Sequence, residues 1–180
     1  FADSGGEHGM STMMRHYLAG LLAHADETTY FLAPYVNSHK RFAADTFAPT
    51  KAIWSVDNRT AGYRVVASES ASVRVECRIG GADLNPYLAI AAQIAAGLAG
   101  IEQKLALEPE LAGDAYRATD ARAIPGNLRD AAVALDGSAM LRAAFGDDVV
   151  EHYVHAARWE QAEFDRAVTD YEVARGFERA

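Results

Sequence analysis

Residues 73 to 79 read Val-Arg-Val-Glu-Cys-Arg-Ile, with apolar and charged residues in strict alternation. Side chains on a β-strand point alternately to its two faces, so the pattern predicts a strand with one charged and one apolar face. The charged face carries Arg74, Glu76 and Arg78. Neighbours on one face lie about 6 to 7 Å apart, close enough for two guanidinium groups and a carboxylate to meet one polyanionic ligand and its metal ion. The alternative is a solvated strand face with a ladder of salt bridges.

Basic residues are concentrated around this strand. The chain of 180 residues has a formal net charge of -8, yet residues 40 to 78 hold seven Lys or Arg against four Asp or Glu. A local positive excess on an acidic chain favours a bound anion there. The stretch lacks the basic helix and aromatic platforms typical of nucleic-acid-binding proteins, so nucleic acid is a poor candidate. The sequence instead predicts a phosphorylated small molecule.

Two more strands and a turn are predicted before residue 73. Short apolar runs give expected strands at residues 50–56, 62–67 and 72–79. Arg59 and Arg64 are an odd number of residues apart, so one continuous strand would place them on opposite faces. Asn58-Arg59-Thr60 has the composition of a turn, which allows both arginines to point at one site.

Other apolar residues recur at helical spacing. Ser11 and the pair Asn85-Pro86 are helix start signals, because the Ser and Asn side chains accept hydrogen bonds from free backbone amides and Pro in the first turn loses no hydrogen bond. Helices are expected at residues 11–25, 86–105, 127–136, 138–145 and 148–174. In the second helix the expected core stripe is Tyr87, Ala91, Ile94, Leu98, Ile101 and Leu105. In the last helix the expected inner side is Val150, Tyr153, Ala157, Phe164, Val168 and Tyr171.

The composition suits a single domain with one hydrophobic core. Hydrophobic residues make up 50% of the chain, and no repeat, linker or low-complexity tract interrupts it. The single cysteine, Cys77, excludes an internal disulfide framework and suits a reducing cytosol, so a cytoplasmic location is predicted. Residues 86–101 are nearly uncharged, but their short length and Gln93 favour a core helix over a membrane span. No membrane role is expected.

Several separate motifs, in order, resemble the C-terminal half of the glutamine synthetase catalytic domain. They are Asn37-Ser38-His39-Lys40-Arg41, Ala48-Pro49, Asp57-Asn58-Arg59-Thr60 with Arg64, Arg74-Val75-Glu76-Cys77-Arg78, and Asn85-Pro86-Tyr87-Leu88. An ordered set of motifs is much more specific than one glycine pattern. The resemblance implies an α+β fold in which antiparallel strands pack with helices. It also implies that residues 1–180 are the C-terminal portion of the catalytic domain, without the N-terminal β-grasp domain and the first part of the catalytic domain.

The resemblance further implies an ATP-dependent ligase. In this family ATP phosphorylates the side-chain carboxylate of glutamate, and an amine then displaces phosphate from γ-glutamyl phosphate to give an amide. Fixed guanidinium groups and divalent metal ions, Mg²⁺ or Mn²⁺, stabilise the negative charge that develops on the phosphoryl oxygens. The implied partners are glutamate, ATP, an amine and further copies of the chain in a ringed homo-oligomer, a dodecamer. Because the remaining metal ligands lie upstream and family sites form between neighbouring subunits, the isolated piece is expected to be inactive.

Residue roles carry over motif by motif. Arg41 and Arg78 resemble the residues that bind glutamate and its phosphorylated form. Arg59 resembles the residue that faces the transferred phosphoryl group, and it also counts among the ATP contacts. The resemblance assigns two further nucleotide-phosphate contacts and one metal ligand: Arg64 and Arg74, and Glu76.

One departure from the family pattern concerns the choice of amine. In ammonia-using members the segment between Lys-Arg and Ala-Pro ends in a glutamate that helps to strip a proton from ammonium, and Phe47 stands at that place here. A benzyl group cannot act as a base. It can line a channel for the carbon chain of a larger amine, and its face can attract a cationic head. The alternative is that Asp45 takes over the role through a small loop shift.

The predicted function is therefore formation of a γ-glutamyl amide from glutamate and an organic amine, either a polyamine or a small alkylamine. Residues 80–86, Gly-Gly-Ala-Asp-Leu-Asn-Pro, also resemble members that act on such amines. The first alternative is ammonia-dependent glutamine synthesis. An alternative of another class is a catalytically silent structural or regulatory relative. The retained arginines and Glu76 argue against a catalytically silent protein, because several like charges placed close together repel one another and are kept where a ligand or a reaction requires them.

Overall fold

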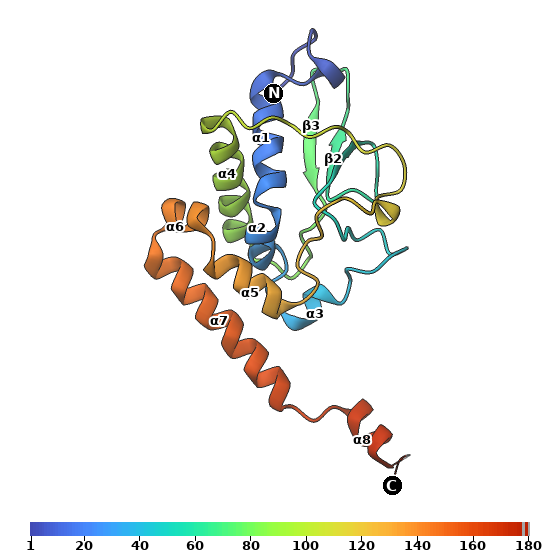
Figure 1. Ribbon diagram of the computed structural model, residues 1–180, viewed down its shortest axis with the longest axis vertical. Helices are drawn as coiled ribbons and strands as arrows, with labels where there is room; N and C mark the ends of the chain where they lie inside the picture. Colours follow the sequence, from blue (N-terminus) through green and yellow to red (C-terminus); the bar gives the residue numbers. More distant parts are fainter. Residues whose placement is uncertain (178, 180) are drawn as a thin grey trace.

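The computed structural model describes residues 1–177 and 179, and it has an α+β fold (Figure 1). A sheet stands beside the paired helices α1 and α4, and further helices continue below them. The strands are β1 (Trp54–Val56), β2 (Tyr63–Val66) and β3 (Arg74–Cys77). The α-helices are α1 (Thr12–Ala23), α2 (Ala25–Leu32), α3 (Val36–His39), α4 (Pro86–Glu102), α5 (Leu128–Asp136), α6 (Ala139–Phe145), α7 (Asp147–Arg166) and α8 (Asp170–Phe177).

The sheet has three strands in the order β1-β2-β3. β2 and β3 are antiparallel, as expected, and their register places Arg64 opposite Glu76. β1 and β2 are parallel, so the expectation of purely antiparallel strands is wrong for this pair. Parallel pairing requires the chain to return along the length of β1 before β2 begins. This is possible because β1 is only about 10 Å long and the connection at residues 57–62 can span up to about 20 Å. That loop returns the chain to the start of β1, and Asp57 begins the return with a positive φ of 49°.

The predicted helix starts are confirmed. The Ser11 hydroxyl accepts a hydrogen bond from the Met14 amide (3.2 Å), and the Asn85 side chain accepts one from the Tyr87 amide (3.0 Å). The first helix ends earlier than expected, because His24 adopts a non-helical conformation between α1 and α2. Its apolar stripe nevertheless points into the core.

The long helix expected at residues 148–174 is instead two helices, α7 and α8. Thr169 and Glu172 form reciprocal hydrogen bonds between side chains and backbone amides, which is a capping box that begins α8. The expected inner side holds only for the first half, where Val150 and Ala157 are buried. Further along, the expected inner residues are exposed: Phe164, Val168 and Tyr171.

The contact face of α4 also differs from the expected stripe. Tyr87 is 85% exposed, and Ile94 and Leu98 are about half exposed. The buried face is made of small residues instead: Ala89, Ala92, Ala96, Gly97 and Gly100. Small residues allow the backbones of α1 and α4 to approach closely, and that contact outweighs the burial of the larger side chains. No helix in the described part of the chain is long and apolar enough to cross a membrane.

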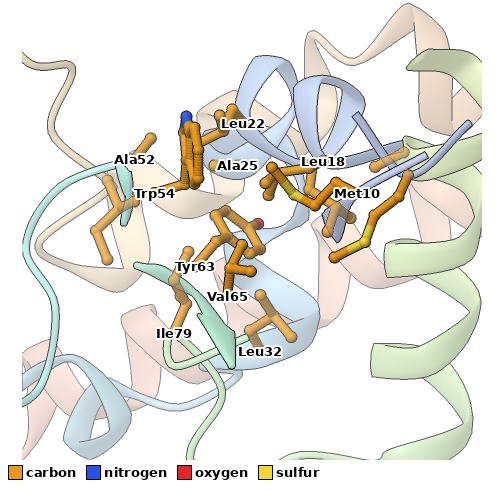
Figure 2. Packing of buried hydrophobic residues seen from close by; sticks show 14 of the residues in the cluster. Met10, Leu18, Leu22, Ala25, Leu32, Ala52, Trp54, Tyr63, Val65 and Ile79 are labelled. Atoms are coloured by element: carbon orange, nitrogen blue, oxygen red, sulfur yellow. The ribbon is translucent and has the colours of Figure 1, made fainter. Parts of the chain in front are cut away.

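The main core lies between α1 and the sheet. Figure 2 shows Trp54, Tyr63 and Val65 of the sheet packed against Leu18 and Leu22 of α1. The two apolar residues that flank β3, Val73 and Ile79, belong to this core and are 5% and 0% exposed. The predicted faces of residues 73–79 are therefore confirmed, because the charged side chains project away from these anchors.

The close approach of α1 and α4 gives a stability prediction. A Cβ atom on Gly100 would lie 2.3 Å from the carbonyl oxygen of His16 and 2.6 Å from the Cα of Gly20. Because both atoms are backbone, Gly100→Ala is expected to lower the free energy of unfolding by about 3 kcal/mol, measured by urea denaturation. Gly126→Ala is the matched control, since a Cβ atom there would have nothing within 4 Å. Equal stability of the two variants would contradict this packing.

Candidate active site

Glu76 lies at the centre of a charged cluster on the solvent side of the sheet. One carboxylate oxygen accepts a hydrogen bond from Arg78 at 2.5 Å, and the other accepts one from Arg64 at 3.2 Å. Arg64 also donates to the Asp57 carboxylate at 3.0 Å. The antiparallel register produces this arrangement, because directly opposed residues on paired strands share a face. The ladder of salt bridges considered from the sequence is therefore present.

Arg78 connects β3 to two loops. Its Nε donates to the carbonyl oxygen of Arg59, and its Nη2 donates to the carbonyl oxygen of Phe47, both at 3.1 Å. With the bond to Glu76, one guanidinium group fixes the turn at residues 58–60 and the loop at residues 41–50 relative to the sheet. The turn itself is formed as expected, because the Asn58 side chain accepts hydrogen bonds from the amide and hydroxyl of Thr60.

Arg41 has a different environment from the arginines of the cluster. Its guanidinium group lies over the ring of Phe42, with 4.7 Å between the guanidinium carbon and the ring centroid. Burial lowers the pKa of Arg41, and the nearby Asp83 carboxylate opposes that change. Two of its nitrogen atoms, Nε and Nη2, are buried without a hydrogen-bond partner in the described part of the chain. Buried donors without partners are uncommon, and on a cation they indicate a place for an anion.

Two hollows meet at Phe47. The first, of about 550 Å³, is lined by Arg41, Glu76, Arg78 and Phe47 among others. The second, of about 620 Å³, is lined by Arg59 and by Phe47 again. The Phe47 side chain is 59% exposed, and its backbone is in the left-handed region with a φ of 58°. This residue therefore stands at the boundary between the two arginine-lined spaces.

Three of the predicted site residues are not brought into these hollows. Arg64 lines neither space, although it is bound to Glu76. Asp45 is exposed on the same loop with a positive φ of 65°, and it lines neither space. Arg74 is also exposed, and its guanidinium group donates to the carbonyl oxygen of Ser72 at 3.3 Å. Arg74 shares the charged strand face with Glu76 but takes no part in the cluster, because it lies at the far end of β3.

Sequence reasoning missed the segment that forms one wall of the second hollow. Residues 110–114 belong to none of the strands, helices and motifs predicted from the sequence, yet they line that space. Glu110 accepts hydrogen bonds from the Val56 amide at 2.8 Å and from the Ser55 hydroxyl at 3.2 Å. The Asn58 side chain donates to the Gly113 carbonyl oxygen at 2.6 Å. The signal in the sequence was the polar turn at Asn58 and Thr60, whose side chains can form hydrogen bonds with another segment of the chain.

The residues that the structure describes do not complete a metal site by themselves. Within residues 1–177 and 179, no group of three or more His, Cys, Asp or Glu side chains is placed to hold a metal ion. Glu76 supplies one carboxylate of the hard-oxygen type that Mg²⁺ and Mn²⁺ prefer. Both of its oxygens are bound by arginine here. Glu76 is thus one candidate ligand that lacks companions among the described residues.

The fold and the cluster together define an α+β domain that places several guanidinium groups beside and within two hollows of its surface. Residues 1–176 match the model of the glutamine synthetase catalytic domain. The chain belongs to the glutamine synthetase family.

Named relatives include enzymes with organic amines in their names. The chain is 50% identical over 171 residues to gamma-glutamylethanolamide synthetase GlnA4 of Streptomyces coelicolor, covering 95% of this chain and 37% of that protein. It is 38% identical to glutamate-isopropylamine ligase of a Pseudomonas species, covering 97% and 39%. Glutamine synthetase of Thermus thermophilus is 36% identical, with 97% and 41% covered.

A solved structure gives the same family assignment. A structure of GmaS in complex with ADP superposes with a TM-score of 0.87 at 30% sequence identity, covering 99% of this chain and 42% of that chain. The chain thus spans about two fifths of the length of the relatives that it matches.

Proposed function

We propose that the full-length protein is an ATP-dependent glutamate-amine ligase whose acceptor is an organic amine, a polyamine or a small alkylamine. The single observation that carries the choice of amine is the position of Phe47, whose exposed side chain borders both arginine-lined hollows. A ring at that place offers an apolar surface and no base. The names of the ethanolamide and isopropylamine enzymes among the relatives support the same choice.

The proposed reaction has two steps. A carboxylate oxygen of the glutamate side chain attacks the terminal phosphorus of ATP, and ADP leaves. The amine nitrogen then bonds to the side-chain carboxyl carbon of γ-glutamyl phosphate, the bond from that carbon to the phosphate oxygen breaks, and the nitrogen loses a proton. Negative charge on the phosphoryl oxygens increases in both steps, so fixed positive charge at this place favours the transition states over the ground states.

We assign the substrate contacts to the first hollow. Arg41 and Arg78 bind glutamate and its phosphorylated form, and the two unpartnered nitrogen atoms of Arg41 support this role because a carboxylate would satisfy both. Arg59 faces the transferred phosphoryl group, which fits its exposed position in the second hollow. Arg64 and Arg74 contact the nucleotide phosphates. Arg74 is exposed and outside the cluster, and among the described residues its guanidinium group makes one hydrogen bond, to the carbonyl oxygen of Ser72, which leaves its other N–H groups available to a ligand.

We propose Glu76 as one ligand of a Mg²⁺ or Mn²⁺ ion whose other ligands belong to the remainder of the full-length protein. A divalent ion there would neutralise phosphate oxygens of ATP. Glu76 also orients Arg64 and Arg78 by binding one with each carboxylate oxygen. We further propose that the full-length protein acts in the cytoplasm as a ringed homo-oligomer, a dodecamer, in keeping with the family resemblance.

The test is phosphate release by the full-length enzyme with glutamate, ATP and a panel of amines that includes ammonium, ethanolamine, isopropylamine and putrescine. We expect at least one organic amine to have a higher specificity constant than ammonium. The 180-residue piece, assayed in parallel, is expected to show no ligase activity, because its described residues do not complete a metal site. Equal or better use of ammonium would instead favour the glutamine synthetase alternative, and no turnover with any amine would favour the silent relative.

A further inference from the structure

A third hollow, away from the arginine cluster, is lined by aromatic side chains. It lies where the end of α2, the start of α4 and the middle of α7 meet, and its volume is about 330 Å³. The chain has 2 Trp, 8 Tyr and 7 Phe, and five of these line this one space: Tyr30, Phe31, Tyr35, Tyr153 and Trp159. Such a volume is at the lower end of the range of small-molecule sites, about 300 to 1,000 Å³. The space therefore suits a small ligand.

The inner wall of the hollow is rigid and the outer wall is open. Tyr30 and Phe31 are buried, and Tyr153 contacts both, with ring centroids 6.2 and 5.4 Å apart. At the rim, Tyr35 and Trp159 are 50% and 58% exposed. Two large aromatic side chains from different segments thus face solvent across a packed aromatic base. An opening of this kind admits a ligand without unfolding any element.

The hollow also contains one carboxylate, Glu160, which follows Trp159 on α7. Within the described residues Glu160 has no partner among the ion pairs, which use other acids of α7 such as Glu151, Glu163 and Asp165. Burial raises the pKa of Tyr30 to about 12, and Tyr153, Tyr35 and Glu160 add to the effect. The Tyr30 hydroxyl therefore stays neutral, and Glu160 is the negative group near it.

Aromatic rings and an unpaired carboxylate select the same kind of ligand. The face of an aromatic ring carries negative electrostatic potential, so an organic cation gains from several rings at once and buries its methyl groups against them. This side of α7 already holds a cation in that way, because the ammonium group of Lys40 lies 5.6 Å from the ring centroid of Phe164. A neutral apolar ligand would form no ion pair with the carboxylate of Glu160, and an anionic ligand would be repelled by that carboxylate.

We propose that this hollow, formed by the five aromatic residues and Glu160, is a binding site for a small alkylammonium ion. It shares no lining residue with the two hollows that meet at Phe47. The site is therefore separate from the candidate active site, and the inference does not depend on the proposed ligase activity.

The test uses choline, a quaternary ammonium ion whose nitrogen cannot attack an acyl phosphate. Its neutral isostere 3,3-dimethyl-1-butanol has the same shape without the charge. Binding of both to the full-length protein is measured by saturation-transfer difference NMR of their methyl protons. We expect saturable choline binding in the millimolar range or tighter, and about tenfold weaker binding of the neutral isostere. Absence of saturable choline binding, or equal affinity for both compounds, would overturn the proposal.

Surface variants of α7 locate the bound choline. Trp159→Ala and Glu160→Gln are each expected to weaken choline binding about tenfold, and Glu160→Gln is expected to leave binding of the neutral isostere unchanged. His155→Ala and Glu163→Gln are the matched controls, because both residues are on the same helix and outside the lining of the hollow. Arg78→Ala should have no effect. Choline binding that is lost in Arg78→Ala and retained in Trp159→Ala would place choline in the candidate active site and refute the inference.

Discussion

Replacement of Arg78 by alanine in the full-length enzyme is expected to reduce turnover at least a hundredfold, which corresponds to about 3 kcal/mol of transition-state stabilisation. Arg78 supplies positive charge to the first hollow, where we place γ-glutamyl phosphate. It also holds the carbonyl oxygens of Arg59 and Phe47 and one oxygen of Glu76. Its loss therefore removes a charge and loosens two loops together. Steady-state kinetics with glutamate, ATP and the preferred amine measure the effect.

Two variants separate charge from fold in this experiment. Val73→Ala, on the buried face next to the same strand, is expected to lower stability by about 1 to 3 kcal/mol and leave turnover of the folded enzyme largely intact. Arg78→Lys keeps the charge but cannot reach three partners with one ammonium group, so it is expected to fall between wild type and Arg78→Ala. If Val73→Ala and Arg78→Ala lose equal activity at equal folded fraction, the assignment of the two faces is wrong.

Replacement of Phe47 by glutamate is expected to shift the ratio of specificity constants towards ammonium by about ten to a hundredfold. At neutral pH ammonia is present mostly as ammonium, which must lose a proton before its nitrogen can attack. A carboxylate beside the incoming nitrogen therefore favours its use. An organic amine instead loses the apolar contact of the ring, where each buried methylene group contributes about 0.8 kcal/mol. The measurement is the specificity constant of wild type and variant for ammonium and for the preferred organic amine.

Asp45→Asn is the matched control for this loop. Asn tolerates the positive φ at position 45, so the substitution removes the charge without straining the backbone. Because Asp45 lines neither hollow, we expect the ratio of specificity constants to stay unchanged. A loss of ammonium use in Asp45→Asn would show that this carboxylate serves the reaction. An unchanged ratio in Phe47→Glu would mean that Phe47 does not decide the choice of amine.

The sequence predicted the local parts of the candidate site well. The alternation at residues 73–79 was sufficient to place Glu76 and Arg78 on a solvent face, because side-chain direction on a strand depends only on the parity of the position. Ser11 and Asn85 were sufficient to begin two helices, because a cap acts on amides two or three residues away. The motifs around Arg41, in their order along the chain, were sufficient to indicate the family.

Contacts between distant residues were not predictable in this way. The pairing of Glu76 with Arg64 depends on the register between β2 and β3, and the wall formed by residues 110–114 depends on the path of a long connection. The buried face of α4 was predicted from the helical spacing of its apolar residues. The structure instead buries its small residues, because Gly20 and Gly100 let two backbones meet.

By itself the sequence determined the strand and helix signals, the local excess of positive charge and the family motifs. Each of these is a property of residues close together in the chain. Only the tertiary structure decided the parallel pairing of β1 with β2, the position of Phe47 between two hollows and the aromatic hollow beside Glu160. The last two of these features bring together segments that are far apart in sequence. Their geometry follows from packing the whole domain, in which burial of one face fixes what the opposite face presents to solvent.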